Sequence, residues 1–155
     1  MRRRRALSAA LALALASSGC AIPRWPAEGP MTSAFGVRWR GLLPEVHRGV
    51  DIGVPTGTPV HAMAGGRVRF AGVQGGFGNA VWVDHGGGVL SLYAHLSRLD
   101  VATGQAISSG QRLGLSGATG NVSGPHLHFE VWRWGRPVDP VPLLGGPPAG
   151  VSPAP

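Results

Sequence analysis

Gly124-Pro125-His126-Leu127-His128-Phe129-Glu130-Val131 is the stretch that predicts both the fold and a site. Alternate side chains of an extended strand point to the same side. The stretch therefore places three polar side chains on one face and three apolar ones on the other: His126, His128 and Glu130 against Leu127, Phe129 and Val131. The apolar face can pack into a core. The two imidazoles can then lie in a groove, where they share a metal ion or divide the roles of ligand and proton carrier.

A His-x-His pair also occurs by chance on exposed strands, so a second segment has to support the site. His47 and Asp51 are four residues apart and fall on the same side of either a helical turn or a strand. Gly49 between them favours a strand or a bend. Imidazole nitrogen and carboxylate oxygen suit zinc, although the fragment alone is more simply explained as a surface His–Asp pair.

The composition predicts a turn-rich, all-β domain with one modest core. The chain has 155 residues, of which 26 are glycine and 14 are proline, and only 14% are charged. Residues 80–84 and 89–96 flank three glycines and predict a β-hairpin. On the second arm, the alternation predicts one polar face with Ser91, Tyr93 and His95. We expect His95 to be a further site residue, whereas Ser91 and Tyr93 line the groove or serve in cross-strand packing.

The remaining histidines and the glycine-rich segment carry no predicted chemistry. His85 follows the first hairpin arm and His61 lies in a short strand, so both are expected to be exposed and structural. Residues 72–79 lack the Lys-Ser/Thr pair of a phosphate-binding loop, which excludes a nucleotide site of that kind.

The net charge gives only weak support for nucleic-acid binding. All 14 basic residues are arginine, and Arg2–Arg5 hold four of them, within a formal charge of +7. Without that cluster, ten arginines face seven carboxylates, a charge of +3. We therefore expect no nucleic-acid partner and a domain compatible with an anionic cell-wall surface.

Residues 1–20 have the pattern of an export signal. The charged Arg2–Arg5 precede an apolar run at 6–16 that is shorter than the ~20 residues that span a bilayer. Small residues then lead to Cys20, the only cysteine, as in a lipoprotein leader, although Ser17 stands where leucine is usual. We predict an exported, periplasmic protein with a lipid anchor at Cys20. The alternative is an ordinary signal peptide that is cleaved nearby.

The rest of the chain divides into three predicted parts. Residues 21–30 contain three prolines and little apolar pattern, which predicts a linker. Residues 31–143 form the predicted domain. Residues 144–155 are rich in proline, glycine and alanine and are expected to form a flexible tail.

A zinc hydrolase site needs three protein ligands and an open position for water. His47, Asp51 and one histidine of the His126/His128 pair supply such a set. His95 and the other member of the pair remain to move a proton or to stabilise an oxyanion. Sequence alone leaves open which histidine of the pair is the ligand.

Three segments together resemble the lysostaphin-type, or LytM-like, zinc metallopeptidases: residues 47–60 (HRGVDIGVPTGTPV), 93–96 (YAHL) and 116–131 (SGATGNVSGPHLHFEV). The resemblance covers roughly residues 31–140 in the family's order. It implies a compact antiparallel β-sheet domain, similar to a barrel-sandwich, with an active-site groove walled by loops. It also implies that His47, Asp51 and His128 bind one Zn²⁺ ion, and that His95 and His126 form an uncoordinated catalytic pair.

The resemblance implies a peptidoglycan endopeptidase that cuts peptide stems or cross-links. The lipoprotein pattern favours a D-alanyl–diaminopimelate cross-link over a glycine bridge. The rival hypothesis is a non-catalytic regulator of a cell-wall amidase or of an envelope complex, because one branch of the family has lost its ligands. Glu130 is expected either to orient a histidine from behind or to be a solvated strand residue.

Overall fold

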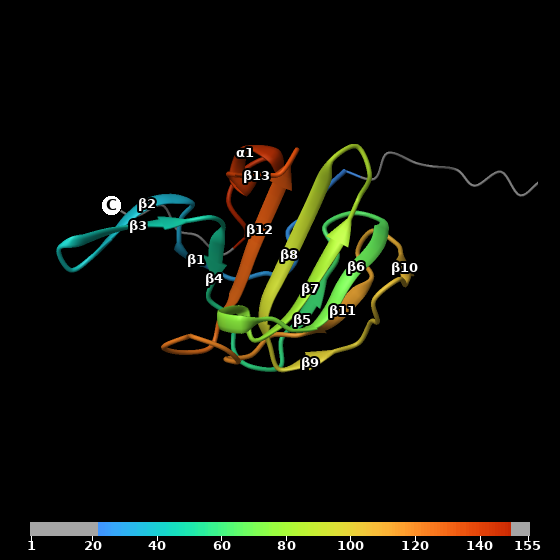
Figure 1. Cartoon of the computed structure of the whole chain (residues 1–155), viewed down its shortest axis with the longest axis horizontal. Helices are drawn as coiled ribbons and strands as arrows, with labels where there is room; N and C mark the ends of the chain where they lie inside the picture. Colours follow the sequence, from blue (N-terminus) through green and yellow to red (C-terminus); the bar gives the residue numbers. More distant parts are fainter. Residues whose placement is uncertain (1–21, 150–155) are drawn as a thin grey trace, which may run out of the picture.

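This computed structural model describes residues 22–149 of the chain (Figure 1). Strands make up almost all of the regular secondary structure in this range. The predicted leader, the lipid anchor at Cys20 and residues 150–155 of the predicted tail lie outside this range. The elements follow one another as β1 (Met31–Ser33), β2 (Gly36–Arg40), β3 (Leu43–His47), β4 (Val50–Ile52), β5 (Pro59–His61), β6 (Gly66–Val73), the 3-10 helix η1 (Gly75–Phe77), β7 (Asn79–Asp84), β8 (Val89–Leu96), β9 (Arg98–Leu99), β10 (Ala106–Ile107), β11 (Arg112–Leu115), β12 (Leu127–Arg133), β13 (Arg136–Val138) and α1 (Pro140–Leu143).

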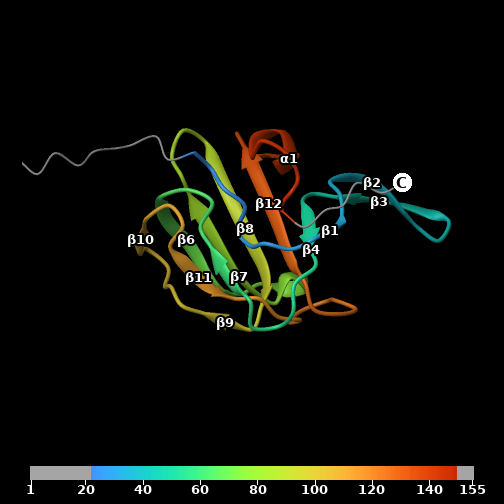
Figure 2. The same ribbon diagram turned by 180° about the vertical axis from the view of Figure 1, so that it is seen from behind.

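The main sheet is antiparallel and has the strand order β1-β4-β12-β8-β7-β6-β10, with β13 paired to β12. A second sheet, β5-β11-β9, lies beside it, and β2 and β3 form a separate hairpin that projects from the body (Figures 1 and 2). The all-β antiparallel fold is confirmed. Among residues 22–149, no helix is long and apolar enough to cross a membrane.

The core confirms the alternation predicted for the His-x-His strand. Leu127, Phe129 and Val131 are fully buried, and they share one core with residues of both sheets, including Val60 of β5 and Leu113 of β11. One face of β12 is thus held in the hydrophobic interior. The opposite face is free to carry polar side chains.

A β-bulge changes the predicted faces of β8. Val81 of β7 pairs with Tyr93, but Asn79 pairs with Leu96, so Ala94 and His95 together oppose one residue. His95 has a φ of 62°, which turns its side chain out of the alternation. The predicted shared face of Ser91, Tyr93 and His95 is therefore wrong. Ser91 and Tyr93 are fully buried on the core side, and only His95 lines the groove.

The segment before β1 packs onto the domain, in contrast to the linker expected for residues 21–30. It contains no strand, as predicted, but Ala27 is buried in the core. Trp25 lies edge-on to Phe129 and donates a hydrogen bond from Nε1 to the Gly146 carbonyl at 2.9 Å. The described part of the predicted tail, residues 144–149, is likewise attached, because Leu144 packs against the core.

Candidate metal centre

The sheet register brings the two predicted halves of the site together. β12 lies between β4 and β8, and His128 pairs directly with Asp51 on one side and with Ala94 on the other. His47 ends β3, from which the chain turns into β4 through Gly49. A Cβ at Gly49 would lie 2.2 Å from the Phe129 carbonyl oxygen, so only glycine lets this corner lie against β12.

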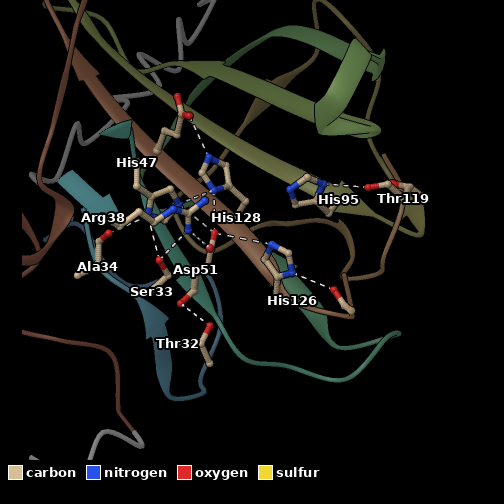
Figure 3. Close-up of polar contacts among 12 residues, drawn as sticks. Thr32, Ser33, Ala34, Arg38, His47, Asp51, His95, Thr119, His126 and His128 are labelled. Carbon is tan, nitrogen blue, oxygen red and sulfur yellow. Dashed lines mark hydrogen bonds and ion pairs between the residues drawn. The ribbon is translucent and has the colours of Figure 1, made fainter. Parts of the chain in front are cut away.

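Three ligand atoms converge on one point (Figure 3). Asp51 Oδ1 lies 3.2 Å from His47 Nε2 and 2.8 Å from His128 Nδ1, and the two nitrogens are 3.2 Å apart. An ion that sits ~2.0–2.2 Å from each atom, as zinc does, can touch all three at once. All three residues are buried. The donor set therefore fits a single divalent metal ion.

The outer ring nitrogens of both histidines are held by hydrogen bonds. His47 Nδ1 donates to the Ala34 carbonyl at 2.7 Å, and His128 Nε2 donates to Glu130 Oε1 at 2.9 Å. With a metal ion bound, these bonds would favour the tautomers that point a lone pair inward. Glu130 is only 2% exposed, and its second oxygen accepts a hydrogen bond from Trp132 Nε1. The alternative of a solvated Glu130 is therefore wrong.

The charges of the cluster stabilise one another. Burial raises the pKa of Asp51, but hydrogen bonds to His128 and His47 outweigh this and hold the pKa well below its usual range. Burial lowers the pKa of His128, but its bonds to Asp51 and Glu130 raise the pKa to about 9. Arg38 adds a cation 3.5 Å from Asp51 Oδ2. The centre is thus built for a negative Asp51 beside positive charge.

His95 and His126 lie beside the ligand cluster and outside it. Their ring centroids are 4.8 Å apart. His95 Nδ1 donates to the Thr119 carbonyl and His126 Nδ1 to the Gly124 carbonyl, both at 2.9 Å (Figure 3). In the neutral rings, Nε2 therefore carries the lone pair. Burial lowers the pKa of His95, which favours this neutral form.

The five predicted site residues line one groove of about 590 Å³. The β2–β3 hairpin, η1 and the loop at residues 121–125 contribute its walls. Phe77 of η1 stacks on His128 with ring centroids 5.7 Å apart. This contact and the roles of Arg38 and Trp132 were not predicted. Trp132 lies four residues after His128 and so on the same face of the strand, which was the available signal, whereas Phe77 belongs to η1 and has no such signal.

The other two histidines lie outside the groove and are half-buried, not exposed as predicted. His61 is in β5. His85 follows β7 and bonds to the Gly65 carbonyl and to Ser91 Oγ. His85 thus has structural partners, as the sequence indicated.

Comparison with known proteins connects this geometry to one group. Residues 45–140 match the family model of peptidase family M23. The chain is 45% identical over 113 residues to the DD-carboxypeptidase/endopeptidase Mpg of Neisseria meningitidis, an alignment that covers 72% of this chain and 26% of Mpg. It is 38% identical over 133 residues to the murein hydrolase activator EnvC of Escherichia coli, covering 83% and 31%. The chain thus spans about a quarter to a third of the length of these curated relatives.

A solved structure agrees with the sequence matches. A zinc-containing peptidase from Vibrio cholerae superposes with a TM-score of 0.73 at 35% identity, over 80% of this chain and 39% of that one. The resemblance seen in the sequence is therefore confirmed for both the family and the fold.

Proposed function

Because the chain belongs to peptidase family M23, we propose that it is a zinc-dependent endopeptidase that hydrolyses peptide stems or cross-links of bacterial peptidoglycan. The observation that carries the proposal is the convergence of His47, Asp51 and His128 beside two histidines that are not part of the cluster. The M23 family acts on peptidoglycan, and the groove of about 590 Å³ is within the size range of ligand-binding sites.

Zinc held by His47, Asp51 and His128 would supply a Lewis acid that acidifies water and polarises a carbonyl group. The chain's own residues would then move the proton. Nε2 of His95 or His126 accepts a proton from the attacking water as the oxygen bonds to the carbonyl carbon. The same nitrogen returns the proton to the amine when the C–N bond breaks. A protonated imidazole can also donate a hydrogen bond to the developing oxyanion.

Digestion of purified muropeptides with a mass readout tests this proposal. The zinc-loaded protein should release peptide fragments, and His128→Ala should lose both zinc and activity. His95→Ala and His126→Ala should keep zinc, and at least one of them should lose activity by ~10²–10⁴-fold. The variant with the larger loss identifies the principal base. The proposal is wrong if the zinc-loaded wild type cuts no muropeptide and His128→Ala behaves identically.

The similarity to EnvC supports a second candidate, a non-catalytic activator of a cell-wall amidase. An amidase stimulation assay separates the two functions. An activator should stimulate equally as wild type and as His95→Ala, because stimulation requires no proton transfer at His95. An endopeptidase should lose its own cleavage in His95→Ala or in His126→Ala, whichever removes the principal base.

We further propose that the protein acts in the cell envelope, tethered to a membrane through Cys20. The substrate expected there is a D-alanyl–diaminopimelate cross-link. Metabolic labelling with a fatty acid should mark the wild type, and Cys20→Ser should abolish the label. Labelling that persists in Cys20→Ser would exclude this anchor.

A further inference from the structure

We infer that Arg48 binds a free carboxylate of the substrate and so selects stem peptides that carry one near the cleaved bond. The inference rests on the proposed function and adds the chemical class of substrate. It starts from the position of Arg48 between the ligand His47 and the tightly packed Gly49. The side chain of Arg48 is exposed and lines the groove.

Packing fixes the backbone on both sides of Arg48. His47 is 4% exposed, and its ring is held by Ala34 and by the ligand cluster. Gly49 lies against the Phe129 carbonyl of β12 with no room for a Cβ. Arg48 therefore extends from a corner that is fixed on both sides. A cation on a rigid corner loses less conformational entropy on binding than one on a mobile loop.

Every other charged side chain on the groove wall has a partner inside the protein. Arg38 Nε lies 3.3 Å from Glu45 Oε2, and Arg38 Nη1 lies 3.5 Å from Asp51 Oδ2. Glu130 is satisfied by His128 and Trp132. Among the described residues 22–149, by contrast, the Arg48 side chain has neither an ion pair nor a hydrogen bond. Within the described part of the chain, the groove thus presents one guanidinium, that of Arg48, whose donors have no protein partner.

The chemistry of a free guanidinium identifies its ligand. Arginine offers five N–H donors in a planar fork that matches a carboxylate with two parallel hydrogen bonds. Stem peptides of peptidoglycan contain acidic residues whose second carboxylate stays free along the chain. Glycine bridges have no such group. A stem peptide lying in the groove can therefore place a carboxylate on Arg48 while its peptide bond lies at the metal centre.

Two muropeptides that differ only in one carboxylate, free or amidated, provide the test. The zinc-loaded wild type should cleave the free acid with a kcat/KM ~10–100-fold higher, mainly through a lower KM. Arg48→Met should lower kcat/KM for the free acid to about the level for the amide, and Arg48→Lys should retain part of the preference. Arg136→Met, which removes an exposed arginine outside the groove, is the matched control and should behave as wild type.

Binding measurements separate this inference from the proposed function. Calorimetric titration of both peptides into the zinc-loaded double variant His95→Ala/His126→Ala, with and without Arg48→Met, reports recognition without cleavage. A preference for the free acid that disappears with Arg48→Met supports the inference even if the wild type cuts neither peptide, a result that would overturn only the endopeptidase. Equal binding and equal cleavage of the two peptides by wild type, or a preference that persists in Arg48→Met, overturns the role of Arg48.

Discussion

Glu130 is the side chain on which the orientation of His128 depends. It accepts the Nε2 proton of His128 at 2.9 Å, and Trp132 supplies the second hydrogen bond to the same buried carboxylate. Glu130→Gln removes the negative charge and one acceptor oxygen while it preserves the shape. We expect zinc affinity to fall ~10–100-fold, because ligand orientation and basicity both depend on this contact.

Competition with a chromophoric chelator measures this zinc affinity directly. Trp132→Phe, which keeps a ring but removes the N–H donor, should give a smaller loss in the same direction. Asp84→Asn is the matched control, since Asp84 is a partly exposed carboxylate of the same sheet and lies outside the groove. Unchanged affinity in Glu130→Gln would show that the contact is only structural.

At the scale of single residues, residue type and spacing in the sequence predicted which side chains come together. The His-x-His alternation placed His126 and His128 on one face, and the four-residue spacing placed His47 beside Asp51. The ion pair of Arg38 with Asp51 could not be predicted in this way. It depends on where the β2–β3 hairpin places Arg38 relative to β4, which is a tertiary arrangement with no local sequence signal.

At the scale of elements, the bulge in β8 marks the limit of periodicity arguments. A period of two holds only while the pairing is regular. Because Ala94 and His95 both oppose one residue of β7, His95 turns to the groove and Leu96 returns to the core. His95 was thus predicted as a site residue, but on a face that the structure assigns to the core. The pairing register with the neighbouring strand decides which face of the sheet such a residue occupies.

The core side of β8 carries a buried polar chain that predicts a pH dependence of stability. The Met63 N–H donates to Tyr93 Oη, and Ser91 Oγ lies 2.9 Å from that oxygen and 2.7 Å from His85 Nε2. His85 Nδ1 donates to the Gly65 carbonyl. His85 can accept at Nε2 only when neutral. Burial agrees with this, since it lowers the pKa of His85 below the usual 6.5.

Acidification should therefore weaken the contribution of His85 to stability. Below pH 6.5 the unfolded chain binds a proton at His85 while the folded protein does not, so the free energy of unfolding falls as the pH falls towards the folded-state pKa. We expect wild type to exceed His85→Gln by ~1–2 kcal/mol at pH 7.5 and by less at pH 5. Urea unfolding of wild type and His85→Gln, both treated with a chelator, measures this difference. The contributions of the other titrating groups are the same in both proteins and cancel in the difference. A difference that is constant with pH would contradict the prediction.

At the scale of the whole molecule, the segments at the two ends of the described chain contact each other and the core. Trp25 packs on Phe129 and bonds to Gly146, which lies 121 residues further along the chain. Composition alone predicted a linker and a tail here, because the first segment has three prolines and little apolar pattern and the second is rich in proline, glycine and alanine. The contact of one tryptophan with the core is enough to order a segment whose composition predicts a linker. Only the folded structure shows which residue it contacts.

Replacing Trp25 should therefore destabilise the domain although it lies before the first strand. We expect Trp25→Ala to cost about 2 kcal/mol, less than for a fully buried tryptophan because Trp25 is only half-buried. Trp25→Phe should retain the ring contact and lose only the hydrogen bond. Trp134→Ala removes an exposed indole, 76% accessible, and is the control with no comparable loss. Equal urea midpoints for Trp25→Ala and wild type would restore the linker interpretation.

Removal of the metal should loosen one side of the molecule more than the rest. An ion at His47, Asp51 and His128 would join β3, β4 and β12, and β1 and the β2–β3 hairpin are attached through these strands. A ligand present at ~1,000 times its Kd stabilises the folded state by ~4 kcal/mol, which corresponds to a Tm shift on the order of 10 °C. Chelation should produce a fall of this size, provided that zinc loss is verified.

Hydrogen exchange locates the effect. After chelation, amides of β3 and β4 should lose protection first, whereas β6, β7 and β8 keep theirs, because their core contacts do not involve the ligands. Asp51→Ala should melt at the same temperature with and without chelator, since it has no site to empty. Verified zinc removal that leaves both the Tm and the hydrogen exchange of β3 and β4 unchanged would contradict this prediction. The three strands would then be held by packing alone, and the ion would contribute to catalysis but not to stability.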